Sequence, residues 1–302
     1  MDSESKNGPS YWRFIQPQLL IWVLLTYSIG VGLVHHQGGA LDWVNILLGS
    51  VLGILFILMR NYLSAFYDHP SSPTCGLRRD DPRYAELKGL DRQILLVISL
   101  TMITAIALDI IILMVRHSLT LSAVAILLVA FLISFFSAVP PFQLEKKGYG
   151  EVLEAILIAN LTPAIGYVLN EPSLHVLLIM LTLPLTLLYL AQRIVLELET
   201  YVFDRTHNVQ SLVMRLDWQK AMVGHNYLVL LSFVFVGLFA LLGQPWSLTW
   251  PMFLPLLIGI YQIIQVQGII TGAPPRWKLL KLTATSTFVV MAYLVTFTLW
   301  IS

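Results

Sequence analysis

"LELETYVFDRTHNVQSLVMRL", residues 196–216, joins a long apolar run to a strongly polar segment. Within it, Glu197, Glu199 and Asp204 precede Arg205. Charged side chains near the end of an apolar helix are costly in lipid, so they usually face a protein interior or water. The stretch therefore predicts a polar site at the end of a membrane-spanning helix, and the rest of the chain decides which kind of site it is.

The composition of the whole chain is that of a membrane protein. Of its 302 residues, 57% are hydrophobic and 12% are charged, whereas charged residues make up about a quarter of a soluble domain. Long apolar runs recur along the sequence, each able to cross a hydrocarbon core of about 30 Å as a helix. Alternating segments of about ten residues, typical of a membrane barrel, do not occur. We expect an all-α bundle forming one polytopic domain over residues 1–302, with nine helices at about 15–35, 42–66, 93–115, 119–138, 151–170, 174–199, 219–243, 248–270 and 279–300.

The basic residues lie almost entirely on one side of this predicted topology. The N-terminus and the connections after the even-numbered spans carry nearly all of them, and Arg116 is the exception on the other side. The positive-inside rule then places the N-terminus and the long loops in the cytoplasm. The polar start "MDSESKNGPSYW" has no pattern of a cleavable signal. We expect a multi-pass protein of the cytoplasmic (inner) membrane.

The sixth span carries four polar residues on one face. Arg193, Glu197, Thr200 and Asp204 follow each other at intervals of 4, 3 and 4 residues, which aligns them along one helical stripe. The cost of charge in lipid predicts that the stripe faces a cavity. Two alternatives remain open: Arg193 and Glu197 pair at i,i+4 and neutralise each other, and Asp204 with Arg205 merely begins a solvated loop.

Two further polar stretches lie on the same predicted side. Asn61 precedes Asp68 by about two helical turns at the end of the second span. In "AVPPFQLEKKGYGEVLEA" the proline pair ends the fourth span, and Lys146 and Lys147 are available for an anion, although topology alone also explains two lysines there. Polar groups gathered at one face favour a site that takes a polar head from the cytoplasm and an apolar tail from the bilayer. A transporter would more often place its binding groups near the midplane.

These motifs resemble those of the UbiA superfamily of intramembrane prenyltransferases, in particular the branch that prenylates dihydroxynaphthoate in menaquinone biosynthesis. The segment "DRTHNVQSLVMRL" is similar to the family pattern D-R-x-x-G-K-x-T-L-x-x-R-L, and "PPFQLEKKGYGE" is similar to P-P-F-R-L-x-x-x-G-x-G-E. Asn61 matches the asparagine that opens the family's first motif. The resemblance covers essentially the whole chain and implies nine spans with the N-terminus inside.

The resemblance also implies a chemistry. Family members hold two Mg²⁺ ions on N-D-x-x-D-x-x-x-D of the second span and D-x-x-x-D of the sixth, and these ions bind the diphosphate of a polyprenyl donor. Ionisation leaves an allylic cation that an aromatic acceptor captures. Carboxylates suit Mg²⁺ because it prefers hard oxygen ligands.

This chain departs from that pattern at four of the five aspartate positions. After Asn61 the three positions hold Tyr62, Ala65 and His69, and Asp68 is one residue out of step. In the second motif Thr200 replaces the first aspartate and only Asp204 remains, with Asn208 and Val209 at the glycine and lysine positions. Other carboxylates that lie near the same mouth are possible substitutes: Asp68, Asp80, Asp81, Glu197 and Glu199.

Two classes of function follow. The first is a divergent, non-catalytic protein that keeps a cavity for an isoprenoid, quinone or pigment tail, for instance as a subunit of a respiratory or photosynthetic complex. The second is an active, Mg²⁺-dependent prenyltransferase. The missing aspartates favour the first. Both predict membrane lipid and an isoprenoid or quinone-type ligand as partners, and no nucleic acid. The predicted head-group residues are Asn61, Asp68, Lys146, Lys147, Arg193, Glu197, Thr200, Asp204 and Arg205, with Asp204 as the candidate metal ligand.

Overall fold

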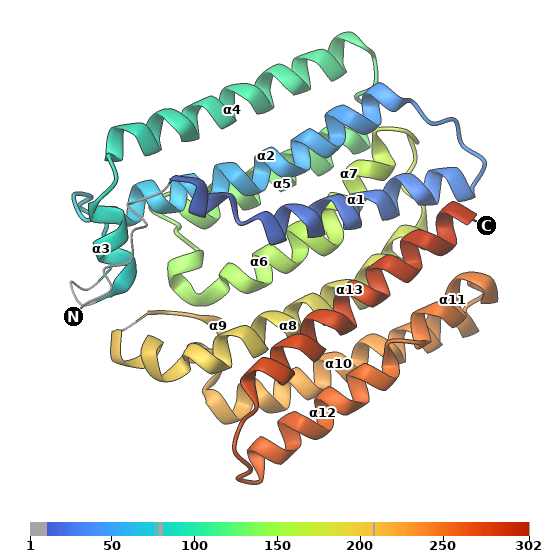
Figure 1. Cartoon of the computed structure of the whole chain (residues 1–302). Helices are drawn as coiled ribbons and strands as arrows, with labels where there is room; N and C mark the ends of the chain where they lie inside the picture. The colour runs from blue at the N-terminus through green and yellow to red at the C-terminus, as the bar shows by residue number, and fades with distance from the viewer. Residues whose placement is uncertain (1–10, 76, 78–80, 208, 302) are drawn as a thin grey trace.

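A computed structural model describes residues 11–75, 77, 81–207 and 209–301, and every regular element in them is helical (Figure 1). These residues include nine helical spans long and apolar enough to cross a membrane, as the sequence predicted. The elements are η1 (Tyr11–Ile15), α1 (Pro17–His36), α2 (Trp43–Asp68), α3 (Pro82–Lys88), α4 (Arg92–Val115), α5 (Leu121–Ala138), η2 (Glu145–Tyr149), α6 (Gly150–Ile156), η3 (Leu157–Leu161), α7 (Thr162–Val168), α8 (Val176–His207), α9 (Leu212–Leu216), α10 (Trp218–Leu241), α11 (Trp246–Phe253), α12 (Leu256–Ile270) and α13 (Trp277–Ile301).

Helix starts coincide with side chains that cap free backbone N–H groups. The Asp42 carboxylate accepts from Val44 N at 2.9 Å, Asp81 from Arg83 N at 2.8 Å and Asp91 from Gln93 N at 2.8 Å. Short polar side chains at this position stabilise the first turn because its N–H groups have no partner within the helix. These caps fix where α2, α3 and α4 begin.

Three spans differ from their predicted form. The eighth, expected as one helix over 248–270, is divided into α11 (Trp246–Phe253) and α12 (Leu256–Ile270). The fifth, expected as one helix over 151–170, begins at Glu145 and runs through four segments, of which η2 and η3 are π-helical. Wider turns of this kind are common at functional sites. The sixth, expected to end at residue 199, continues to His207 as the 32-residue α8. The apolar run ends near residue 199, but the helical hydrogen bonding continues beyond it, because polar residues can extend a helix that has left the hydrocarbon layer.

The core brings the N-terminal and C-terminal helices together. Trp22 of α1, Tyr189 of α8 and Phe288 of α13 form a cluster of edge-to-face aromatic contacts with ring centroids 5.0–6.0 Å apart. On its other side α1 packs closely on α7, where a methyl group at Gly30 would overlap the Pro163 carbonyl oxygen. Small residues permit this close approach of helix backbones within a membrane.

This packing places several helix ends at one end of the bundle. The last turns of α2 and α8, the first turn of α6 and the short helices α3 and α9 all lie on the left of Figure 1. The charged stretches identified in the sequence belong to these turns and loops, so they meet at a single face of the molecule.

Candidate functional site

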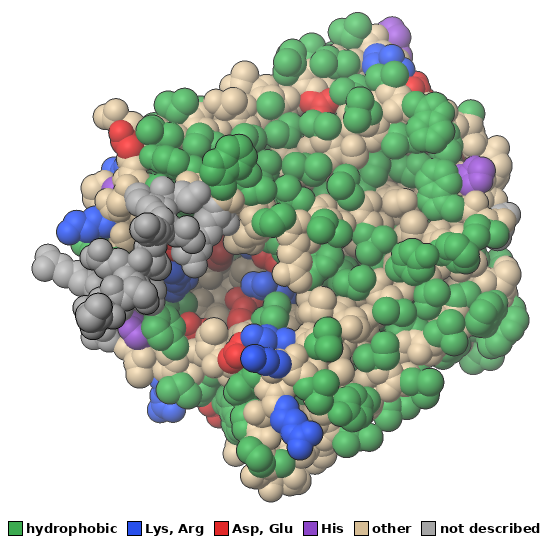
Figure 2. All heavy atoms as spheres, viewed as in Figure 1, with side chains coloured by type: hydrophobic (Ala, Val, Ile, Leu, Met, Phe, Trp, Pro, Cys, Tyr) green, Lys and Arg blue, Asp and Glu red, His purple; other side chains and the backbone are tan. Residues whose placement is uncertain are grey.

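A cavity of about 550 Å³ opens at this end of the bundle, between α2, α6, α8 and the loops beside α3 and α9. Figure 2 shows it as a hollow in which acidic and basic side chains are visible. The sequence prediction named six residues of its lining: Asp68, Lys146, Arg193, Glu197, Thr200 and Asp204. The 4-3-4 stripe of α8 thus faces a common cavity. Further lining residues are Leu77, Asp81, Arg83, Glu145, Glu151, Phe203, Val209, Gln210 and Ser211.

Three predicted residues lie outside the cavity lining. The Asn61 side chain donates to the Phe14 carbonyl at 3.0 Å, so it fastens η1 to α2. Lys147 is exposed, and its carbonyl accepts a hydrogen bond of 2.8 Å from the Arg215 guanidinium. Arg205 is also exposed, because it follows Asp204 by one position and points to another side of α8. Asp80 and Asn208 lie outside the described residues.

A buried ionic network borders the cavity, and the sequence reasoning missed its central members. The Glu154 carboxylate on α6 lies 2.6 Å from Arg60 Nη2 and accepts a 2.6 Å hydrogen bond from the Tyr189 hydroxyl. Arg193 Nε approaches the same carboxylate at 3.5 Å. The ion-pair partner of Arg193 is therefore Glu154 on a neighbouring helix, not Glu197. The available signal in the sequence was Arg60. It is a cation within a membrane span without an acidic residue one helical turn away, so a partner on another helix is expected.

Two carboxyl groups face each other inside the cavity. The side chains of Glu151 and Glu197 are in contact, and Oε2 of each is buried without a hydrogen-bond partner. Glu151, named by the motif but not assigned to the site, is only 8% exposed. Two carboxylates in contact repel each other unless a proton or a cation lies between them. Within the described residues, no cation lies within ion-pair distance of either carboxyl group.

The other carboxylates of the cavity already have partners. Asp68 forms an ion pair with Lys146 at 2.5 Å. Asp204 accepts a 3.0 Å hydrogen bond from the Thr200 hydroxyl, so the residue that replaces the family's first aspartate now binds the second. Asp81 is paired with Arg83 at 3.0 Å. Burial alone raises the pKa of Asp81, but its hydrogen bonds with the Arg83 side chain and backbone N–H outweigh burial and lower it.

The positions that carry Mg²⁺ ligands in the UbiA family do not fit two metal ions here. The Tyr62 hydroxyl donates to the Tyr11 carbonyl at 3.0 Å, Ala65 has no donor atom, and the His69 ring nitrogens lie 2.8 Å from Ser71 Oγ and 3.1 Å from the Leu90 carbonyl. The Tyr62 hydroxyl is thus bonded to η1 and the His69 ring to the segments after α2 and α3, and none of the three residues lines the cavity.

The carboxylates proposed as substitutes for the missing aspartates fall into two groups. Asp68, Asp81 and Glu197 line the cavity, whereas Glu199 is held by Lys281 at 2.6 Å. Within the described parts of the chain, no three His, Cys, Asp or Glu side chains are grouped closely enough to hold a metal ion.

Comparison with known proteins gives a structural match only. No family model and no curated protein sequence matches the chain. A UbiA homologue from Archaeoglobus fulgidus bound to GPP and Mg²⁺ has a TM-score of 0.62 and 14% identity, over 97% of this chain and 99% of that one. A UbiA homologue from Aeropyrum pernix K1 has a TM-score of 0.60 and 10% identity, over 94% and 98%.

A third similar structure is described as digeranylgeranylglyceryl phosphate synthase, with a TM-score of 0.57 and 17% identity over 94% of this chain and 97% of that one. All three alignments run almost from end to end. The comparison confirms, at the level of the fold, the resemblance that the motifs suggested: the chain is a multi-pass membrane protein with the fold of these UbiA homologues, and its described residues include nine helices able to cross a membrane.

Proposed function

We propose that the protein binds an isoprenoid-type lipid with an uncharged polar head, such as a quinone, and does not ionise a diphosphate. The charge of the cavity carries this proposal. Six carboxylates line it against three cations, Arg83, Lys146 and Arg193. A diphosphate would add negative charge to an already acidic cavity, and the two-metal ligand set that offsets such charge in the family is not in place. A neutral head group meets no such repulsion.

The lining offers suitable contacts for a quinone head. The Nε of Arg193 faces Glu154, but the side chain lines the cavity and is 27% exposed, so its remaining N–H groups can donate to a quinone oxygen. Leu77, Phe203 and Val209 supply apolar surface for the ring. The buried network around Glu154 holds Arg193 in position from behind. In this proposal the protein is a non-catalytic, lipid-holding member of the cytoplasmic membrane, for example a subunit of a respiratory or photosynthetic assembly.

The second candidate is Mg²⁺-dependent prenyl transfer to an aromatic acceptor with relocated ligands. One observation favours it: Glu151 and Glu197 form an unneutralised acid pair near Asp204, where a single cation would relieve the repulsion. The structure of the Archaeoglobus homologue with GPP and Mg²⁺ is consistent with this class. The two candidates differ in their response to metal and in the head group that they accept.

The deciding experiment compares two ligands on the purified full chain in detergent. Binding of a short-chain quinone and of geranyl diphosphate is measured by quenching of tryptophan fluorescence, with Mg²⁺ and with EDTA. We expect quinone binding that EDTA leaves unchanged, and no measurable diphosphate binding. In the same preparation, dihydroxynaphthoate and geranyl diphosphate should give no prenylated product. Mg²⁺-dependent product, lost in Asp204→Asn, would overturn the proposal in favour of the second candidate.

Three variants sharpen this test. Arg193→Gln should weaken quinone binding by about tenfold to a hundredfold, because a charged hydrogen bond is worth about 1.5–3 kcal/mol. Lys220→Gln, an exposed cation on α10 outside the cavity, should have no effect. Thr200→Asp restores the D-x-x-x-D spacing with Asp204. It should still not create Mg²⁺-dependent diphosphate binding, since Tyr62, Ala65 and His69 remain without carboxylates.

A further inference from the structure

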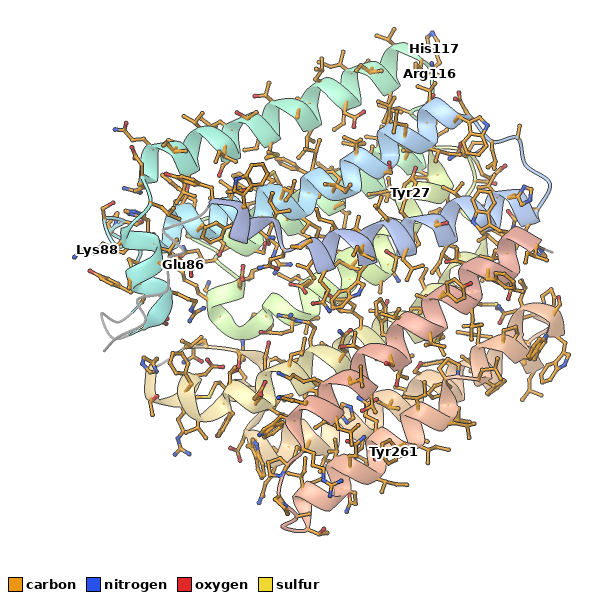
Figure 3. The ribbon with its side chains drawn as sticks, viewed as in Figure 1. Tyr27, Glu86, Lys88, Arg116, His117 and Tyr261 are labelled. Atoms are coloured by element: carbon orange, nitrogen blue, oxygen red, sulfur yellow. The ribbon has the colours of Figure 1, made fainter. Side chains whose placement is uncertain are left out.

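A second cavity, of about 270 Å³, lies between α12 and α13 at the end where the two helices are connected. Its walls are mainly apolar, and Arg276 is the charged residue among them. The lining consists of Tyr261, Ile264, Gln265, Gly268, Ile269, Ala273, Pro274, Arg276, Leu279 and Leu280. It shares no residue with the cavity beside Asp204. Figure 3 shows Tyr261 on α12 at the bottom of the bundle, far from Glu86 and Lys88 of α3.

This second cavity is a groove that opens toward the lipid-facing surface. Ile264 is 61% exposed and Tyr261 is 47% exposed, although both lie on a membrane-spanning helix. Apolar side chains of such a helix that are exposed in the isolated chain contact acyl chains in the bilayer. The other end of the groove is the polar turn before α13, which contains Arg276. A lipid molecule can therefore enter from the side, with its tail along the helices and its head at the turn.

The charge around the groove is positive and largely uncompensated. From Trp218 to the end of the chain there is no Asp or Glu, whereas Lys220, Arg276, Lys278 and Lys281 are present. Lys281 is paired with Glu199 of α8. Arg276 and Lys278 form no ion pair within the part of the chain that the structure describes. The turn is thus complementary to an anionic head group, and a basic pocket between membrane helices is a known way of binding one.

The space in the groove depends on a missing side chain. A Cβ atom at Gly268 would have only the Ala273 Cβ nearby, at 3.8 Å, so the position opens into the groove and not into the core. The adjacent Gln265 is fixed by a 3.2 Å hydrogen bond from its Nε2 to Thr283 of α13. The wall is therefore held in place by contacts between the two helices.

We propose that this groove is a binding site for one anionic glycerophospholipid, with its phosphate at Arg276 and an acyl chain along Ile264, Gly268 and Leu279. General attraction between basic loops and an acidic membrane surface would depend on charge but not on the shape of the groove. A specific site depends on both, and this difference makes the two explanations separable.

The test measures lipid binding to the full chain by native mass spectrometry, with phosphatidylglycerol and phosphatidylcholine at equal concentration. The wild type should retain one phosphatidylglycerol in preference to phosphatidylcholine. Arg276→Gln should reduce that preference about tenfold, as expected for loss of a charge-assisted hydrogen bond. Lys220→Gln removes the same charge from α10 and should leave the preference unchanged.

A second pair of variants tests the shape of the groove at constant charge. Gly268→Leu should fill the groove and abolish retention of the lipid. Gly224→Leu on α10, where a Cβ would meet no atom within 4 Å, is the matched control and should retain it. Equal effects of Arg276→Gln and Lys220→Gln would refute the site, as would normal retention in a folded Gly268→Leu variant. Thermal unfolding in detergent establishes that each variant is folded.

Discussion

Glu154 is the central residue of the buried ionic network beside the cavity. Its carboxylate contacts Arg60 of α2, Tyr189 of α8 and, at longer range, Arg193 of α8. All of these side chains lie in membrane-spanning helices. A charge removed from water needs a partner of opposite sign, and removal of one partner leaves the others uncompensated. The network therefore fixes the relative position of three helices as well as the orientation of Arg193 in the cavity.

We expect Glu154→Gln to destabilise the protein severely, by about 3–5 kcal/mol, because Arg60 and Arg193 lose their common counter-charge. The measurement is the midpoint of thermal unfolding in detergent. The control is Glu199→Gln, which breaks the exposed pair with Lys281 and should cost about 0–1 kcal/mol. Comparable losses in the two variants would show that the buried network does not hold the helices together.

At the scale of the helix, α3 depends on one carboxylate. Asp81 caps its first turn by accepting from Arg83 N, and it also binds the Arg83 side chain. Both contacts are stronger with the ionised carboxylate. The same helix contributes Arg83 to the wall of the cavity, so its folding shapes the entrance to the site.

The lowered pKa of Asp81 predicts a pH dependence for α3. A group whose pKa is depressed in the folded state adds stability above its unfolded pKa of about 3.9, and this stability is lost as the pH falls through the lower folded value. Protection of the α3 amides from hydrogen exchange, corrected for intrinsic rates, should therefore be constant from pH 7 to pH 5. It should fall below pH 4. Asp81→Asn should remove this transition, and its persistence in that variant would assign it to another group.

The close packing of α1 on α7 gives a second prediction at the scale of the helices. Gly30→Ala should destabilise the protein by about 1–3 kcal/mol, because the new methyl group overlaps the Pro163 carbonyl and forces the helices apart. Gly224→Ala, in open space on α10, should be neutral or stabilising by up to about 1 kcal/mol, since alanine favours the helix. Thermal unfolding of the two variants in parallel checks this, and equal stability would contradict the close approach.

For the whole molecule, the basic residues predict that the cavity opens to the cytoplasm. In a Cys75→Ser background, Ser173→Cys lies on the connection between α7 and α8, and Lys147→Cys lies at the cavity end; both positions are exposed. A membrane-impermeant maleimide added to intact cells should label position 173 and not 147. Labelling of position 147 alone would show that the topology is the reverse of the predicted one. Labelling of both positions would show that they do not lie on opposite sides of the membrane.

The sequence predicted the number and order of the spans because length and apolarity determine them locally. It also predicted the α8 stripe, because helical periodicity aligns Arg193 with Asp204. It did not identify Glu154, whose role depends on where α6 lies relative to α2. It placed Asn61 in the site, whereas a contact with η1, distant in sequence, turns that side chain elsewhere. Contacts between elements, and not the elements themselves, were the part that the sequence left undetermined.

The length of α8 has a consequence for the depth of the cavity. At 1.5 Å per residue its 32 residues extend about 48 Å, whereas the hydrocarbon layer is about 30 Å thick. With Val176 at the far boundary and no tilt, Arg193 lies about 26 Å along the axis and Asp204 about 42 Å. Arg193 then marks the inner edge of the hydrocarbon, and Asp204 stands among the lipid phosphates. A lipid held between them would keep its head within reach of water-soluble reagents while its chain stays in the hydrocarbon layer. If the proposed function is right, aqueous reductants should therefore reduce a bound quinone without its release.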